Sequence, residues 1–227
     1  MTDRRRRIWV TRTRPGGDQT ATLLIAQGFA PIVAPVLAAR PIPGAAIDLT
    51  GVDAIAFTSG HAVTAFAALS DVRALRAFAV GEATGEAARR VGFDAVTVGH
   101  GGAHALARVI AAAEPPPAKV FIPNVAEPAA DLVALLAEAG IAAAQTAVYE
   151  TVPTGEAVPL DDVDAILIHS ARAGRLVADD LAGKPQCARI IACVISEAAA
   201  APLRGLGLKA IEVAAVPSEL ALLALLA

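Results

Sequence analysis

Short polar segments follow several apolar runs in this chain, and they hold the side chains with the clearest chemical use. Each offers a hydroxyl, a charge or a small residue just before an expected helix. The free N–H groups of a helix N-terminus bind carboxylates and phosphates, and nearby hydroxyls add to them. The candidate binding residues are Thr11, Arg12, Thr58, Ser59, Gly81, Glu82, Ala83, Thr84, Ser170, Ala171, Ser196, Glu197 and Ala198.

Each segment taken alone also has an ordinary structural explanation. Ser and Thr at such positions commonly cap helices, and a first-turn Glu complements the helix dipole. His61 and His169 follow expected strands and are either proton carriers or surface hydrogen bonders. Several such turns around one shared cleft would suit a large polyanion.

Tyr149 is the only tyrosine of the chain and stands where a polar segment with two prolines begins, residues 149–159. A phenol can donate a hydrogen bond or a proton at neutral pH. We therefore predict that Tyr149 faces a cleft between domains as a catalytic group, with a packing role as the alternative.

The sequence lacks the motifs of several other kinds of binding site and active site. The sequence contains no GxGxxG after the first strand, no GxxxxGK[ST] and no GxSxG. Cys187 and Cys193 fit buried thiols, and the four scattered histidines do not suggest a metal site. We expect neither a metal nor an organic cofactor.

Composition narrows the partners. The 227 residues are 56% hydrophobic but only 4% aromatic, and the net charge of −3 argues against nucleic-acid binding. The apolar run 220–227 is far shorter than the ~20 residues of a spanning helix. The basic run 4–7 is not followed by the apolar core of a signal peptide. We expect a cytoplasmic protein without membrane contact.

The chain repeats itself once. Four pairs of similar blocks occur in the same order: 8–28 with 120–140, 53–63 with 164–174, 79–93 with 194–208, and 95–110 with 210–225. Ser59 and Ser170 stand 111 positions apart, and Val98 and Val213 stand 115 apart. This pattern indicates a degenerate duplication.

Short apolar runs alternate with Ala- and Leu-rich segments, which indicates parallel sheets covered on both faces by helices. The fold class is therefore α/β, with two doubly wound, flavodoxin-like parallel sheets. The predicted strands are 8–11, 32–34, 54–57, 77–80, 95–98, 120–122, 143–148, 165–168, 190–194 and 210–213.

Two proline-containing segments mark predicted linkers, at about residues 36–40 and 149–155. They predict a discontinuous domain of residues 1–36 plus 155–227 and an inserted domain of residues 40–150, joined by two strands. The alternative is two consecutive domains divided near residue 114, where Ala113–Lys119 also reads as a linker.

The motifs together resemble the uroporphyrinogen-III synthase family over essentially the whole chain. The resemblance rests on Val10-Thr11-Arg12 at the first strand, Asp53 to Ser59, Ala79 to Thr84, Tyr149 in VYETVP, the strand ending at Ser170, and the closing turn Ile195-Ser196-Glu197.

The resemblance implies a cofactor-free enzyme that cyclises the linear tetrapyrrole hydroxymethylbilane, with loss of water and inversion of ring D. It implies a monomer, with a transient contact to the preceding pathway enzyme as a further expectation. Departures from the family pattern stand at Asn124, His169 and Ala199. They mark either a divergent enzyme or a non-catalytic tetrapyrrole- or anion-binding homologue. A two-domain solute-binding protein is a third, weaker alternative.

Overall fold

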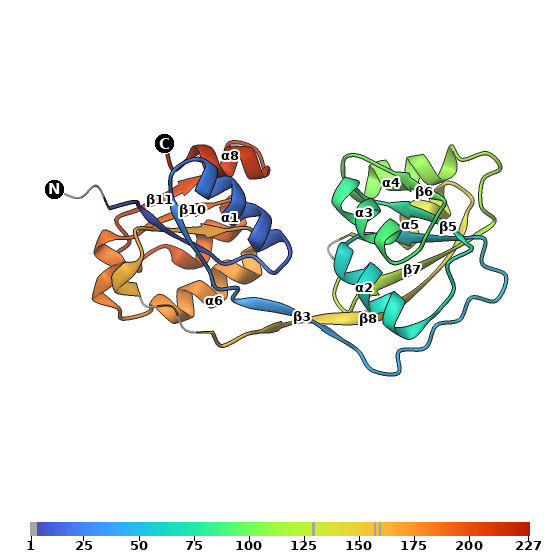
Figure 1. The fold of residues 1–227 in the computed structure, drawn as a ribbon, viewed down its shortest axis with the longest axis horizontal. Coiled ribbons are helices and arrows are strands. Elements are labelled where there is room, and N and C mark those ends of the chain that lie inside the picture. Colours follow the sequence, from blue (N-terminus) through green and yellow to red (C-terminus); the bar gives the residue numbers. More distant parts are fainter. Residues whose placement is uncertain (1–3, 129, 157, 159) are drawn as a thin grey trace. The chain divides into compact units, whose positions relative to one another are not determined.

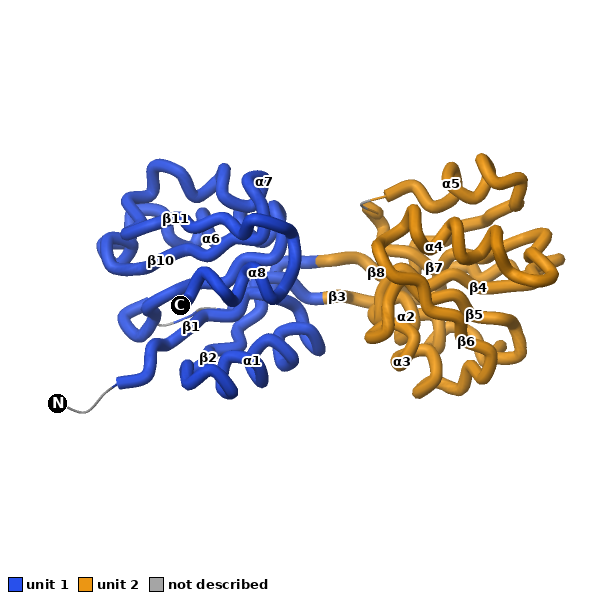
Figure 2. Tube along the Cα trace, turned by 90° about the horizontal axis from the view of Figure 1, so that it is seen from above, with its two compact units in different colours: residues 1–38, 152–227 blue, residues 39–151 orange. Residues whose placement is uncertain are grey.

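The protein forms two compact units in the computed structural model, which describes residues 4–128, 130–156, 158 and 160–227. Unit 1 comprises residues 1–38 and 152–227, and unit 2 comprises residues 39–151 (Figure 2). No boundary falls near residue 114, because that residue lies inside unit 2. Residues 1–3 of the expected outer domain, and Ala157 and Pro159 behind the second linker, lie outside the described residues.

Strands and helices alternate along the chain (Figure 1). The strands are β1 (Arg7–Val10), β2 (Ala30–Val33), β3 (Leu37–Pro41), β4 (Ala54–Phe57), β5 (Arg76–Ala79), β6 (Val96–Val98), β7 (Lys119–Val125), β8 (Ala142–Pro153), β9 (Ala165–Ile168), β10 (Ile191–Val194) and β11 (Ala210–Val213). The helices are α1 (Gly16–Ala26), α2 (Gly60–Leu69), α3 (Glu82–Arg90), α4 (Gly102–Ala111), α5 (Leu132–Glu138), α6 (Ala171–Leu181), α7 (Glu197–Ala200) and α8 (Glu219–Ala224). Short 3₁₀ turns occupy Leu160–Asp162, Pro185–Arg189 and Ala201–Leu203.

Unit 1 contains a five-stranded sheet in the order β11-β10-β9-β1-β2, with parallel pairing throughout. One face of the sheet, with Trp9 and Ile166, packs on apolar residues of α6 and α7. The other face, with Val10 and Leu167, packs on Leu24 of α1 and on α8. The sheet is thus covered on both faces, as its uninterrupted apolar strands predict.

Unit 2 contains a six-stranded sheet in the order β3-β8-β7-β4-β5-β6. Phe57 and its neighbours on one face pack on α2 and α3, where Phe66 and Phe93 meet Phe57 edge-on. The opposite face packs on Leu106 of α4 and on α5. The prediction of an α/β protein built from parallel sheets is confirmed in both units.

The repeat seen in the sequence reappears in the strand order. The matched blocks pair β1 with β7, β9 with β4, β10 with β5 and β11 with β6, and β2 and β8 follow the matched helices α1 and α5. Reading both sheets in these terms gives the same spatial order, although the counterpart of β1, the first strand of unit 1, is β7, the fifth strand of unit 2. The two units therefore have one architecture, permuted in the chain.

The segments expected as linkers are themselves strands. β3 and β8 are neighbours in the sheet, and the boundary between the units falls within both. In unit 2, the N–H of Ile42 donates to the carbonyl of Val148 at 2.9 Å, and Arg40 binds Glu150 through two hydrogen bonds. A strand was expected to cross at each linker, and β3 and β8 occupy these segments. Pro41 is tolerated in β3 because β3 is an edge strand.

Candidate functional site

In each sheet the chain order of the strands runs outward in opposite directions from one pair of neighbouring strands, and the helices that follow this pair cover opposite faces. In unit 2 these strands are β4 and β7, and in unit 1 they are β1 and β9. Ligands of open parallel sheets bind beyond the carboxyl ends of such strands. Both of these places carry polar side chains, and we call them the switch points of the two units.

The switch point of unit 2 holds a neutral hydroxyl pair. Ser59 caps α2, where its Oγ accepts a hydrogen bond from the N–H of Ala62 at 3.1 Å. The same Oγ lies 2.9 Å from the phenol oxygen of Tyr149, and either hydroxyl can donate. Beside them, Thr58 donates to the side-chain oxygen of Asn124 at 3.4 Å, and Asn124 is 4% exposed.

Tyr149 lies inside β8 rather than in a loop, and it is 8% exposed within the apolar cluster of unit 2. The ring of His61 is centred 5.8 Å from the tyrosine ring. Burial lowers the pKa of His61, so its neutral form is favoured beside the phenol. The surroundings of this hydroxyl pair thus favour uncharged groups.

The switch point of unit 1 instead holds a carboxylate of the chain itself. Glu219, in the first turn of α8, accepts hydrogen bonds from Arg12 at 3.0 Å and from Thr20 at 2.5 Å. Its Oε2 also lies 3.1 Å from Nε2 of His169. Burial tends to raise the pKa of Glu219, but hydrogen bonds from His169 and Thr20 and the nearby positive charges outweigh burial and lower it.

Two glycines admit the Arg12 side chain at the start of α1. A Cβ on Gly16 would lie 2.5 Å from Nε of Arg12, and one on Gly17 would lie 2.7 Å from the Arg12 carbonyl oxygen. Any larger residue at these positions would displace Arg12. The local sequence Arg12-Thr13-Arg14-Pro15-Gly16-Gly17 therefore fixes where this guanidinium lies.

Thr11 and Ser170 have structural partners. The Thr11 hydroxyl is buried and donates to the Leu167 carbonyl at 2.7 Å, which ties β1 to β9. Ser170 caps α6 and accepts from the N–H of Ala173 at 3.1 Å. Ala171, the next residue, begins that helix.

The turns after β5 and β10 lie one strand away from the switch points. Gly81 and Ser196 are the N-cap residues of α3 and α7, and neither makes a side-chain cap. The glutamates that follow face exposed arginines at equivalent positions: Glu82 pairs with Arg89 and Glu197 with Arg204. Ala83 and Ala198 are exposed, whereas Thr84 is buried. The structure records no hydrogen bond between these turns and the two clusters described above.

Sequence reasoning did not select Thr20, Glu219 or Asn124 as site residues. Thr20 and Glu219 look like ordinary helix residues, and only the packing of α8 brings them to the end of β1. Asn124 was noted only as a departure from the family pattern. It occupies the position that matches Arg12 in the repeated block, and this correspondence could have identified it.

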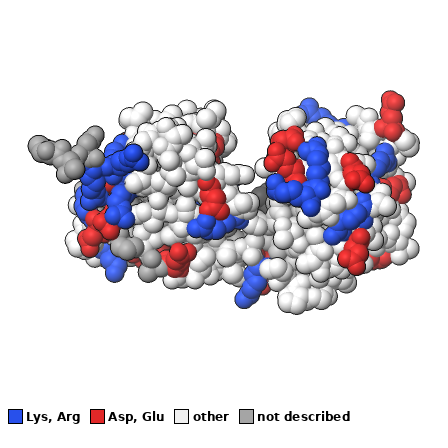
Figure 3. All heavy atoms as spheres, viewed as in Figure 1, with Lys and Arg blue, Asp and Glu red and all other residues white. Residues whose placement is uncertain are grey.

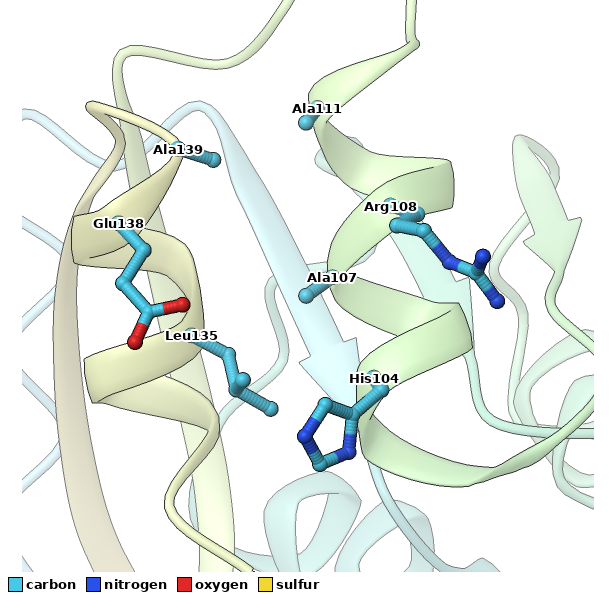
Figure 4. A pocket seen from close by; sticks show the side chains of 7 residues that line it. All are labelled: His104, Ala107, Arg108, Ala111, Leu135, Glu138 and Ala139. Atoms are coloured by element: carbon cyan, nitrogen blue, oxygen red, sulfur yellow. The ribbon is translucent and has the colours of Figure 1, made fainter.

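Cavities also lie away from the switch points. A cavity of about 510 Å³ lies between α4 and α5 of unit 2, where Ala107, Ala111 and Leu135 face it (Figure 4). It shares no residue with either switch point. Within the described residues, no three His, Cys, Asp or Glu side chains are grouped as metal ligands, and no helix is long and apolar enough to span a membrane. On the face seen in Figure 3, both signs of charge are interspersed.

Two α/β units, each with a doubly wound parallel sheet, define a class of two-domain α/β proteins. Solved structures share this fold over nearly their whole length. The uroporphyrinogen-III synthetase of Helicobacter pylori is 18% identical, with 98% of each chain covered and a TM-score of 0.62. A mutant uroporphyrinogen III synthase of Thermus thermophilus is 19% identical, with 97% of each chain covered and a TM-score of 0.50.

The uroporphyrinogen-III synthase family model matches residues 18–224, and the chain belongs to this family. No curated protein sequence matches the chain. The family and the synthase function inferred from the motifs are confirmed at this level. The match does not favour the alternative of a non-catalytic binding homologue.

Proposed function

We propose that this chain is a hydro-lyase that cyclises hydroxymethylbilane to uroporphyrinogen III, with inversion of ring D and loss of water. The observation that carries this proposal is the 2.9 Å pair of Ser59 and Tyr149 at the switch point of unit 2. A phenol at this position would supply a proton at the strand ends, where ligands of parallel sheets bind.

In the proposed reaction the phenol of Tyr149 assists departure of the substrate hydroxyl. The leaving oxygen takes a proton and departs as water, and the substituted α carbon of ring D attacks the carbon left behind. To invert the ring, the bond from that α carbon to the methylene of ring C then breaks, and the methylene bonds to the free α carbon of ring D. The proton lost from that carbon balances the first. Ser59 can turn between donor and acceptor, so it can pair with Tyr149 before and after that transfer. General acid assistance of this kind contributes about 10²–10⁴-fold to a rate.

The rest of the catalysis is attributed to orientation. The substrate is reactive in water and closes into the wrong isomer without guidance, so the protein must fix which ring carbon attacks. The acetate and propionate groups of the substrate would be held by hydroxyls, charged groups and helix N-termini at the strand ends. Beyond Tyr149, the candidate contacts are the thirteen residues named from the sequence.

The proposal also includes the expected domains, location and partners of the protein. The two compact units would act as the domains expected at residues 1–36 plus 155–227 and 40–150. The enzyme would work as a cytoplasmic monomer without a cofactor, with a transient contact to the enzyme that supplies its substrate.

A coupled assay tests the reaction. Hydroxymethylbilane is supplied with the purified chain, and the oxidised products are separated into type I and type III isomers. A dominant type III product supports the proposal. Type I alone, as in the reaction without protein, would reject it in favour of the binding homologue.

A further inference from the structure

We infer that Arg12, Thr20 and His169 form a carboxylate-binding subsite of unit 1, which Glu219 occupies until a carboxylate of the ligand displaces it. The inference rests on the proposed function, because it takes the ligand to be a tetrapyrrole with acetate and propionate side chains. It assigns to Glu219 the role of an internal competitor for the subsite.

Three donor groups from three elements converge on the one carboxylate. Arg12 follows β1, Thr20 belongs to α1 and His169 follows β9. Both oxygens of Glu219 are engaged, Oε1 by Thr20 and Oε2 by Arg12 and His169. A guanidinium, an imidazole and a hydroxyl around two oxygens are the donor set with which proteins bind carboxylates.

His169 shows that the subsite is built rather than incidental. Its side chain is 10% exposed, and since its Nε2 faces a carboxylate oxygen, this nitrogen carries a proton. Its other ring nitrogen, Nδ1, is buried without a hydrogen-bond partner among the described residues. Burying an unpaired polar atom is unfavourable, so this imidazole is held at the subsite at a cost in stability.

The subsite is open to exchange. The side chains of Arg12 and Glu219 are 39% and 25% exposed, so a ligand can reach the guanidinium from solvent. Glu219 belongs to α8, a short helix of six residues. A ligand carboxylate could therefore replace Glu219 while Arg12, Thr20 and His169 keep their places on β1, α1 and β9.

Removing the competitor should strengthen binding. A site that is free only part of the time has an apparent affinity reduced by that fraction. Glu219→Gln should therefore lower the dissociation constant of uroporphyrin III, the oxidised product, by about threefold to tenfold. The change in Soret absorbance on titration with the full chain measures this constant. The matched control is Glu212→Gln, which removes the same charge from an exposed residue of unit 1 and should bind like the wild type.

Glu219→Asp provides a second variant if Glu219→Gln does not fold. It keeps the charge but shortens the reach to Arg12 and His169, so it should also bind more tightly. Equal or weaker binding by a folded Glu219 variant, relative to wild type, would overturn the inference. Because the readout is binding rather than turnover, it is independent of the isomer assay: type I product alone would reject the synthase while the binding difference persisted.

Discussion

Unit 1 and unit 2 place equivalent strands at their switch points, and they fill these points with opposite chemistry. In unit 1, Glu219 is surrounded by Arg12, Thr20 and His169. In unit 2, Tyr149 and Ser59 form a neutral pair in an apolar setting. The difference indicates that a duplicated scaffold can divide its work, with charge recognition in one copy and proton transfer in the other.

The serine caps make this comparison unusually well matched. Ser59 and Ser170 have nearly the same backbone angles, with φ of −160° in both and ψ of 157° and 156°. Each serine Oγ accepts one hydrogen bond of 3.1 Å from the backbone N–H of the residue three positions later. Of the two serines, only Ser59 also contacts a phenol. That phenol belongs to Tyr149 on β8, and the corresponding strand of unit 1, β2, is shorter.

The largest expected effect is on turnover in Tyr149→Phe. Loss of the phenol proton should lower kcat by about tenfold to a hundredfold, at the lower end of general acid contributions. KM should change little, since the carboxylate contacts remain. Initial rates with hydroxymethylbilane measure both constants, and circular dichroism checks the fold. Wild-type kcat in this variant would break the assignment of chemistry to unit 2.

A second difference between the units is helix packing, which Gly174→Ala tests. A Cβ at Gly174 would lie 2.5 Å from the backbone oxygen of Ala199, so α6 and α7 must move apart. We expect a loss of about 1–3 kcal/mol in the free energy of unfolding. Gly60→Ala is the control, since its Cβ would lie 3.8 Å from the nearest atom, an ordinary contact.

Unfolding of each unit can be followed separately in that experiment. Trp9 is the only tryptophan and lies in unit 1, and Tyr149 is the only tyrosine and lies in unit 2. Gly174→Ala should lower the denaturation midpoint seen by Trp9 fluorescence, and Gly60→Ala should leave the midpoint seen by Tyr149 absorbance unchanged. Equal midpoints for Gly174→Ala and wild type would contradict the close helix contact.

The smallest expected effect is a difference in acid sensitivity. Burial lowers the pKa of His61 below its ordinary 6.5, so the stability present above that pH is lost as pH falls through the lower folded value. The lowered pKa of Glu219 gives the same sign below its ordinary 4.5. Acid should therefore weaken unit 2 at a higher pH than unit 1.

His61→Gln should remove the first of these losses, and His104→Gln, at an exposed position of the same unit, should not. Urea midpoints between pH 7 and pH 4 measure the difference, with Tyr149 absorbance and Trp9 fluorescence as the two probes. An unchanged pH profile in His61→Gln would remove this residue as the source.

Much of the fold could be predicted because it depends on local patterns. Buried strands such as β4 and β9 are continuous apolar runs in the sequence. The internal repeat also predicted which strands of the two units correspond. A crossing strand was expected near residues 36–40, but its bounds and its pairing with β8 could not be predicted, because that pairing is a long-range contact. The switch-point turns could be listed from the sequence for the same local reason.

The residues that contact those turns could not be predicted from the sequence. Glu219 lies 207 positions from Arg12, and no local pattern joins a residue of α8 to the end of β1. The contact between Ser59 and Tyr149 spans 90 positions and depends on the order β8-β7-β4. Tertiary packing, not propensity, decides both pairs.

The most direct test of the division of work compares kcat for Ser59→Ala and Ser170→Ala. Each variant loses one helix cap, at a similar cost of about 1 kcal/mol, so the two are matched in stability. We expect kcat to fall further in Ser59→Ala, by about fivefold or more relative to Ser170→Ala, because only Ser59 positions Tyr149. Equal kcat values in two folded variants would contradict it.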